Sequence, residues 1–137
     1  MNTNLKLGEH FIVDLSECDR DLLLNPEQSY ELFSSAVKGA GLTVVDEGLF
    51  KFAPHGFTAF LLLSESHASL HAWPEFGYCA IDLFTCNIGQ NMIPLIEELK
   101  RVFGADDFVL RKVDREAEIA RDKIPFIMPE LEVKHER

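Results

Sequence analysis

The chain has 137 residues, a formal net charge of −10 at pH 7 and a hydrophobic share of 47%. This length fits one compact domain, 1–137, with room for a substantial core, and the composition excludes an intrinsically disordered chain. The acidic balance argues against a nucleic acid or an anionic membrane surface as a partner, because both carry negative charge.

Segment 1–7 lacks the apolar core of a signal peptide, and no stretch approaches the roughly 18 apolar residues of a membrane-spanning helix. We therefore expect a cytoplasmic protein. Cys18, Cys79 and Cys86 follow no CxxC spacing. In a reducing compartment they are expected to be free thiols, not disulfide partners or zinc ligands.

The first predicted element is a strand at 8–15, where β-prone residues partly alternate in polarity. A polar connection over 16–25 follows it. Asn25 and Pro26 mark a helix start, because Asn is a favoured N-cap and Pro fits the first helical position. Apolar residues continue at helical spacing over 30–40, and nearby glycines end the helix.

The rest of the chain is richer in strands. Segments 42–45 and 49–53 predict a second strand, followed by a turn at 54–56. The run FTAFLLL, 57–63, offers almost no polar side chain on either side, which is typical of a strand covered on both faces. Further strands are predicted at 69–73, 78–86 and 108–113, and an amphipathic helix at 93–103.

The predicted order is β-α-β-β-β-β-α-β, an α+β fold built as a two-layer α/β sandwich with both helices on one sheet face. Two helices cannot cover both faces of such a sheet. The doubly apolar strand 57–63 therefore predicts a second cover, and the simplest is another copy of the chain. A homodimer of this kind has a four-layer α/β/β/α arrangement. The charged tail after Asp114 carries no clear prediction.

Potentially reactive side chains concentrate in segment 64–86, which reads SESHASLHAWPEFGYCAIDLFTC. It holds two histidines, two cysteines and the only tryptophan of the chain. Ser66, His71 and Asp82 are the types of a hydrolase triad, but no GxSxG motif surrounds the serine. The histidines and cysteines lack a recognised zinc spacing, so no metal is expected.

Taken together, the motifs of this segment resemble the short bacterial and archaeal S-adenosylmethionine decarboxylases, a pyruvoyl-dependent family. The motifs are S-E-S-H at 64–67, H-x-W-P-E-x-G-Y at 71–78 and D-L-F-T-C at 82–86. Upstream elements of the family also match, as G-x-H at 8–10 and E-C-D at 17–19. The resemblance spans residues 8 to 113.

The resemblance implies a proenzyme that cleaves its own backbone between Glu65 and Ser66. The Ser66 hydroxyl would attack the Glu65 carbonyl, and elimination would then leave a covalent pyruvoyl group derived from Ser66. The products are expected to be a β chain, 1–65, and an α chain, 66–137, with the pyruvoyl group at its N-terminus.

The resemblance also implies roles for further residues. His71 matches the processing base, and Thr58 stands where the family commonly has a serine that assists processing. Cys86 matches the acid that returns a proton to the substrate carbon, after carbon dioxide leaves the Schiff base between substrate and pyruvoyl group. Phe52 matches the aromatic side chain that stacks on adenine near the sulfonium, and Glu75 the carboxylate that receives the ribose hydroxyls.

S-adenosylmethionine is thus the expected substrate, giving the aminopropyl donor for spermidine and other polyamines. Core packing is the alternative role for Phe52, and Trp73 is expected in the core. Ala68, Asn87 and Phe57 depart from the family pattern.

Two other functions stay open. A pyruvoyl-dependent ornithine or arginine decarboxylase on the same scaffold would also need a processing serine and an acid. A non-catalytic regulatory paralogue is the other alternative. The complete set of Ser66, His71 and Cys86 argues against it.

Overall fold

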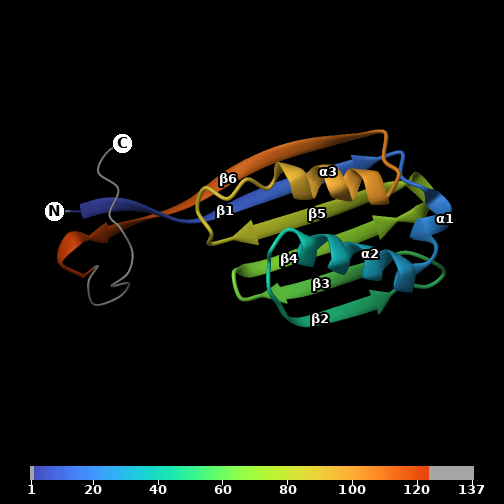
Figure 1. Ribbon diagram of the computed structural model, residues 1–137, viewed down its shortest axis with the longest axis horizontal. Helices are drawn as coiled ribbons and strands as arrows, with labels where there is room; N and C mark the ends of the chain where they lie inside the picture. The colour runs from blue at the N-terminus through green and yellow to red at the C-terminus, as the bar shows by residue number, and fades with distance from the viewer. Residues whose placement is uncertain (1, 124–137) are drawn as a thin grey trace.

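The computed structural model describes residues 2–123 and consists of one antiparallel sheet with helices over one face (Figure 1). The strands are β1 (Asn2–Ser16), β2 (Val44–Lys51), β3 (Phe57–Leu63), β4 (Ser66–Trp73), β5 (Tyr78–Thr85) and β6 (Asp107–Ala120). The helices are α1 (Arg20–Leu23), α2 (Pro26–Gly39) and α3 (Ile93–Val102), with short 3-10 turns at Pro74–Phe76 and Arg121–Lys123. The predicted α+β class and its order of strands and main helices are confirmed.

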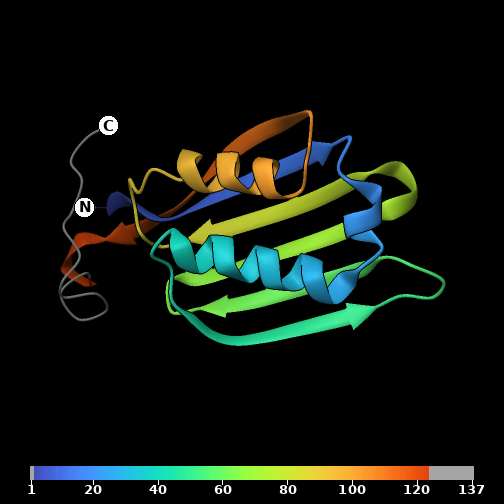
Figure 2. The same cartoon turned by 45° about the vertical axis from the view of Figure 1, so that its right-hand side comes forward.

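The six strands are ordered β2-β3-β4-β5-β1-β6, and every neighbouring pair is antiparallel. Helices α2 and α3 lie side by side over the same face, as predicted (Figure 2). No helix within residues 2–123 is long and apolar enough to cross a membrane.

Local signals set the ends of α2 where the sequence predicts them. The Asn25 side chain accepts a hydrogen bond from the Gln28 N–H at 3.2 Å, and Pro26 follows as the first helical residue. Gly41, with φ of 88°, takes the left-handed conformation just beyond the helix end. Gly104, with φ of 65°, takes the same conformation just beyond the end of α3.

Helix α1 and the start of strand β4 differ from the prediction. Helix α1 lies inside the expected polar connection 16–25; the Asp19 side chain caps it by accepting from the Leu22 N–H at 3.2 Å. Strand β4 starts at Ser66 because its pairing with β3 continues to the hairpin turn.

Strands β1 and β6 are also longer than predicted. They pair with each other from Asn2↔Ala120 to Ser16↔Asp107, whereas β5 covers β1 only from Glu9 onward. Their outer halves therefore form a two-stranded ribbon that projects beyond the sheet (Figure 1). The chain beyond Lys123 lies outside the described residues.

The core lies between the sheet and the helices. In β3, Ala59, Leu61 and Leu63 point to the helices and are buried. Phe60 and Leu62 point to the opposite side and are 42% and 44% exposed. The predicted cover is thus present on one face only within a single chain. We call the other side the open face; its exposed large apolar residues are Phe50, Phe52, Phe60, Leu62, Trp73, Val109 and Val113.

Candidate functional site

The predicted cleavage bond lies in the hairpin between β3 and β4. Leu63 pairs with Ser66, so Ser64 and Glu65 form a two-residue turn. Thr43, just before β2, holds this turn through two hydrogen bonds: its N–H donates to the Glu65 carboxylate at 3.0 Å, and its carbonyl accepts from the Ser64 N–H at 3.0 Å. The Thr43 N–H is the main reason that the pKa of Glu65 lies below its ordinary value.

Ser66 carries the backbone strain of this hairpin. Its φ is 145°, in the region that residues with a side chain rarely adopt. Such a conformation costs on the order of 1–3 kcal/mol, and it persists only where the surroundings enforce it. Here the strained residue follows directly on the peptide bond predicted to break.

The carbonyl of Glu65 has a donor in place. The Cys86 N–H, just after β5, donates to this oxygen at 2.9 Å. The pairing of Ser66 with Thr85 brings the end of β5 beside the hairpin and so explains the contact. A backbone N–H aimed at the oxygen that becomes negative during nucleophilic attack is the arrangement of an oxyanion hole. Residue identities alone do not reveal this contact, because the group involved is backbone.

A second group of predicted residues lines a cavity of about 270 Å³ near the other end of β3 and β4. The lining includes Phe52, Thr58, His71 and Glu75. The Thr58 hydroxyl and the Nδ1 atom of His71 are 3.0 Å apart, since the two residues are direct partners across β3 and β4. The hydrogen bond fixes the orientation of the imidazole ring.

Two residues of this cavity were not assigned correctly from the sequence. Trp73, expected in the core, lies on the open face and is 40% exposed, because β4 ends there and alternation turns its side chain away from the helices. His55 was not singled out, yet its Nε2 lies 3.1 Å from Oε1 of Glu75. Phe52 is 52% exposed, which is inconsistent with the alternative of core packing.

The two groups do not meet within one chain. Ser66 and His71 lie on the same strand, five residues apart, and a strand advances about 3.3 Å per residue, so their backbones are about 16 Å apart. Glu65, Ser66 and Cys86 therefore form one half-site, which we call the cleavage half-site. Phe52, Thr58, His71, Trp73 and Glu75 form the other, which we call the pocket half-site.

The three cysteines differ in access. Cys18 and Cys79 are buried against each other, whereas Cys86 is exposed. A hydrogen bond with the Cys18 thiol, together with burial, raises the pKa of Cys79. Cys86 is thus the thiol that a molecule from solution can reach, and the reading of it as a small core residue does not hold.

Polar side chains on the open face are paired within the chain. Asp14 accepts from the Tyr78 hydroxyl at 2.7 Å and from Arg111 at 3.0 Å. Burial and the bond to Asp14 raise the pKa of Tyr78 to about 12. Asp82 lies 3.2 Å from His10 Nε2 in the same sheet face. Within residues 2–123, no group of three or more His, Cys, Asp or Glu side chains is arranged to hold a metal ion.

Comparison with known proteins gives a consistent result. Residues 9–116 match the family model described as S-adenosylmethionine decarboxylase. Proteins named S-adenosylmethionine decarboxylase proenzyme are similar over most of the chain. The one from Thermotoga maritima is 37% identical over 99 residues, which is 72% of this chain and 76% of that protein. The one from Prochlorococcus marinus is 37% identical over 116 residues, 83% of this chain and 91% of the relative.

An archaeal relative of the same name, from Methanococcus vannielii, is 40% identical over 103 residues, 74% of this chain and 83% of the relative. The fold agrees as well. The crystal structure of the adenosylmethionine decarboxylase from Aquifex aeolicus superimposes with a TM-score of 0.73 at 32% identity, covering 80% of this chain and 91% of that one. This chain belongs to the S-adenosylmethionine decarboxylase family.

Proposed function

We propose that this chain is a proenzyme that cleaves itself between Glu65 and Ser66 and then decarboxylates S-adenosylmethionine. The observation that carries the proposal is the contact at the scissile carbonyl. The Glu65 oxygen already accepts a hydrogen bond from the Cys86 N–H, and the next residue, Ser66, is strained. Both features lower the barrier to attack on this one carbonyl.

The cleavage chemistry follows from the residue types. The Ser66 Oγ attacks the Glu65 carbonyl carbon, the C–N bond breaks, and the freed amine takes a proton, which turns the amide into an ester. The nucleophile is in the same residue as the scissile nitrogen, so proximity supplies a large part of the rate. The Cys86 N–H stabilises the oxyanion during the attack.

Elimination then completes the cut. A base removes the Hα of Ser66, the Cβ–O bond breaks, and Glu65 leaves as a carboxylate at the end of the chain 1–65. Water converts the remaining dehydroalanine to a pyruvoyl group and ammonia. A group made from Ser66 fits this place, because the serine lies in a hairpin whose scissile carbonyl is held by a donor.

We assign the base to His71 of a second copy of the chain. The Thr58 hydroxyl orients its ring, but about 16 Å of strand separate it from Ser66 of the same chain. A twofold dimer in which the open faces pack together, with the pocket half-site of one chain over the cleavage half-site of the other, joins the two groups. Each dimer then contains two composite sites.

The open face has the character of such an interface. It exposes several large apolar side chains that alternation directs away from the helices. Asp14 and Asp82 on this face already have hydrogen-bond partners in their own chain, so covering these carboxylates does not leave them without partners. The proposed assembly is the four-layer α/β/β/α homodimer.

In turnover, the pyruvoyl group supplies the electron sink that makes loss of carbon dioxide possible. The chain's own residues bind and protonate. Phe52 offers an aromatic face to the adenine and the sulfonium, and a cation over such a ring gains about 0.5–2 kcal/mol, depending on desolvation. Glu75 accepts the ribose hydroxyls, and the exposed Cys86 thiol returns the proton to the substrate carbon.

The test is mass spectrometry followed by a substrate comparison. Purified chain should resolve into 1–65 and a second chain that starts with a pyruvoyl group, and Ser66→Ala should stay intact. Carboxyl-labelled S-adenosylmethionine, ornithine and arginine are then supplied separately, and release of labelled carbon dioxide from the first alone is expected. An uncleaved, inactive wild-type chain would contradict the whole proposal; release from ornithine or arginine would contradict the substrate assignment.

A further inference from the structure

Glu9 is a buried carboxylate for which the cleavage and decarboxylation steps have no use. It lies in β1 next to Gly8, faces the helix side of the sheet and is only 1% exposed. Its Oε2 atom pairs with Lys6 Nζ at 3.1 Å and Lys112 Nζ at 3.2 Å. Its Oε1 atom accepts from the Gly89 N–H at 3.3 Å.

These contacts keep the buried carboxylate charged. Burial by itself favours the neutral acid, but the hydrogen bonds from Lys6, Lys112 and the Gly89 N–H outweigh it and hold the pKa of Glu9 below its ordinary value. The two lysines keep partial access to water. The contact with the Gly89 N–H is different in kind, because it ties β1 to a loop that has no regular structure.

That loop begins directly after Cys86. The Asn87 N–H donates to the Thr85 hydroxyl at 2.9 Å, and the Asn87 side chain donates to Gln90 at 3.0 Å. The Glu9 carboxylate, which belongs to β1 and not to the loop, accepts a hydrogen bond from the loop at the Gly89 N–H. Cys86 therefore lies between two anchored points: the end of β5 on one side and the Glu9 contact on the other.

The Cys86 side chain is exposed, so contacts of the thiol with a core do not fix its position. Its backbone has to do so, and the first loop residues set the direction of the thiol. Proton return needs this direction, because a general acid works only within hydrogen-bond reach of the atom that it protonates.

We propose that Glu9 is a positioning residue for the proton donor: its bond to the Gly89 N–H holds the loop that aims the Cys86 thiol at the substrate carbon. This inference rests on the proposed role of Cys86 as proton donor. Glu9 does not touch the reacting atoms, and it acts through the loop.

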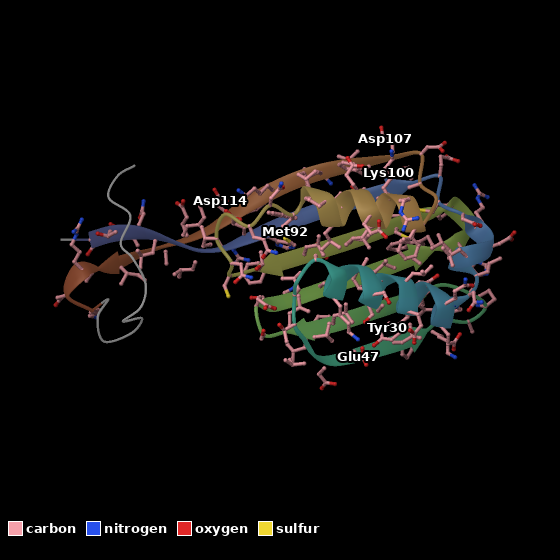
Figure 3. The ribbon with its side chains drawn as sticks, in the orientation of Figure 1. Tyr30, Glu47, Met92, Lys100, Asp107 and Asp114 are labelled. Atoms are coloured by element: carbon pink, nitrogen blue, oxygen red, sulfur yellow. The ribbon has the colours of Figure 1, made fainter. Side chains whose placement is uncertain are left out.

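Two variants separate the loop contact from the ion pairs. Glu9→Gln keeps the length and an oxygen that accepts from the Gly89 N–H, but removes the charge. Glu9→Asp keeps the charge, but the shorter side chain lengthens the distance to that N–H. The matched control is Asp114→Asn on β6 (Figure 3), since Asp114 contacts the same two lysines, Lys6 and Lys112, at 3.5 and 3.7 Å.

The readout is the number of turnovers before inactivation, together with kcat, KM and Tm, all measured on self-cleaved enzyme with S-adenosylmethionine. With a misaimed acid, the proton would reach the carbon that comes from Ser66 instead of the substrate carbon. Water would then release the decarboxylated substrate as an aldehyde and leave its nitrogen on the enzyme as an N-terminal alanine. This inactive form is visible by mass spectrometry. An error of 1 Å in a catalytic group can cost on the order of 100-fold in rate. For Glu9→Asp we expect the number of turnovers per inactivation to fall by about fivefold or more. We also expect a lower kcat, with KM nearly unchanged.

Glu9→Gln should stay close to wild type in turnovers per inactivation, even where its Tm falls, and Asp114→Asn should match wild type. Equal losses in the two Glu9 variants, a loss in Glu9→Gln alone, or no loss in either would overturn the inference. Failure of the wild-type chain to cleave or to release carbon dioxide would instead overturn the proposed function.

Discussion

Cys86 contributes two groups at two stages of the proposed reaction. Its backbone N–H contacts the Glu65 carbonyl, which matters only until the chain is cut. Its thiol is exposed and acts only after the cut. A side-chain substitution removes the second group and keeps the first, so cleavage and turnover can be separated experimentally.

We predict that Cys86→Ser still cleaves itself, because the N–H remains. A hydroxyl ionises far less readily than a thiol, and loss of a positioned general acid costs about 10²–10⁴ in rate, so decarboxylation should be slower by this factor. Cleavage is followed by mass spectrometry and turnover by release of labelled carbon dioxide. Near-normal turnover without accumulation of an N-terminal alanine would mean that another group protonates the substrate.

Thr58→Val should slow self-cleavage while the fold is retained. Valine keeps the shape, but the Nδ1 atom of His71 loses its partner at 3.0 Å. A hydrogen bond of this kind contributes about 0.5–1.5 kcal/mol, which corresponds to a slowing of roughly two- to tenfold if the bond acts on the base. Cleavage half-times are compared with Thr58→Ser, which keeps the hydroxyl and should cleave at nearly the wild-type rate. Equal half-times in all three proteins would remove Thr58 from processing.

At the scale of single residues, the sequence motifs predict which side chains take part but not which backbone groups do. The resemblance pointed to Cys86, but not to its N–H, because a backbone contact depends on strand pairing and not on residue identity. His55 was missed for a related reason. A histidine in a turn between a cis-proline segment and β3 has no local signal, and only the fold brings it to Glu75.

At the scale of elements, predictability followed the range of the interactions. The ends of α2 depend on neighbours within a few residues, such as the Asn25 cap, and were predicted correctly. The extent of β1 depends on β6, about a hundred residues away, and was underestimated. The alternation of buried and exposed residues in β3 could not be predicted from its almost uniformly apolar sequence, because it depends on the helices covering only one face of the sheet.

The contacts of Glu9 with Lys6, Lys112 and the Gly89 N–H join three elements: β1, β6 and the loop after β5. These contacts should make the stability of the fold depend on pH. The pKa of Glu9 is lowered in the folded chain from its ordinary 4.5, so below neutral pH the unfolded chain binds more protons than the folded one. Its contribution is therefore present above pH 4.5 and is lost as pH falls through the folded value. We predict that the difference in unfolding free energy between wild type and Glu9→Gln shrinks from pH 7 to pH 3. Denaturant unfolding at each pH measures it, and a difference independent of pH would contradict the ion pairs.

At the scale of the whole molecule, the main result is the division of the site. Ser66 and His71 are only five residues apart in the sequence. A strand turns this short separation into a long distance, with both residues fixed in β4. The open face supplies the means to close the gap, since it is where a second copy of the chain can bind. In this proposal the homodimer is required for cleavage, because only a second chain brings His71 to Ser66.

Co-expression of two inactive chains tests this directly. Ser66→Ala lacks the nucleophile and keeps His71, whereas His71→Ala keeps Ser66 and lacks the base. Each alone should form uncleaved dimers. In a mixed dimer, however, the Ser66 of one chain meets the His71 of the other, so one of its two sites is complete. Random pairing of equal amounts gives mixed dimers half of the time, and about half of the His71→Ala chains should therefore be cut, while Ser66→Ala chains stay whole. Distinct tags on the two chains show which is cut, and sedimentation confirms that both dimerise. If mixed dimers form and neither chain is cut, His71 does not serve the partner's Ser66.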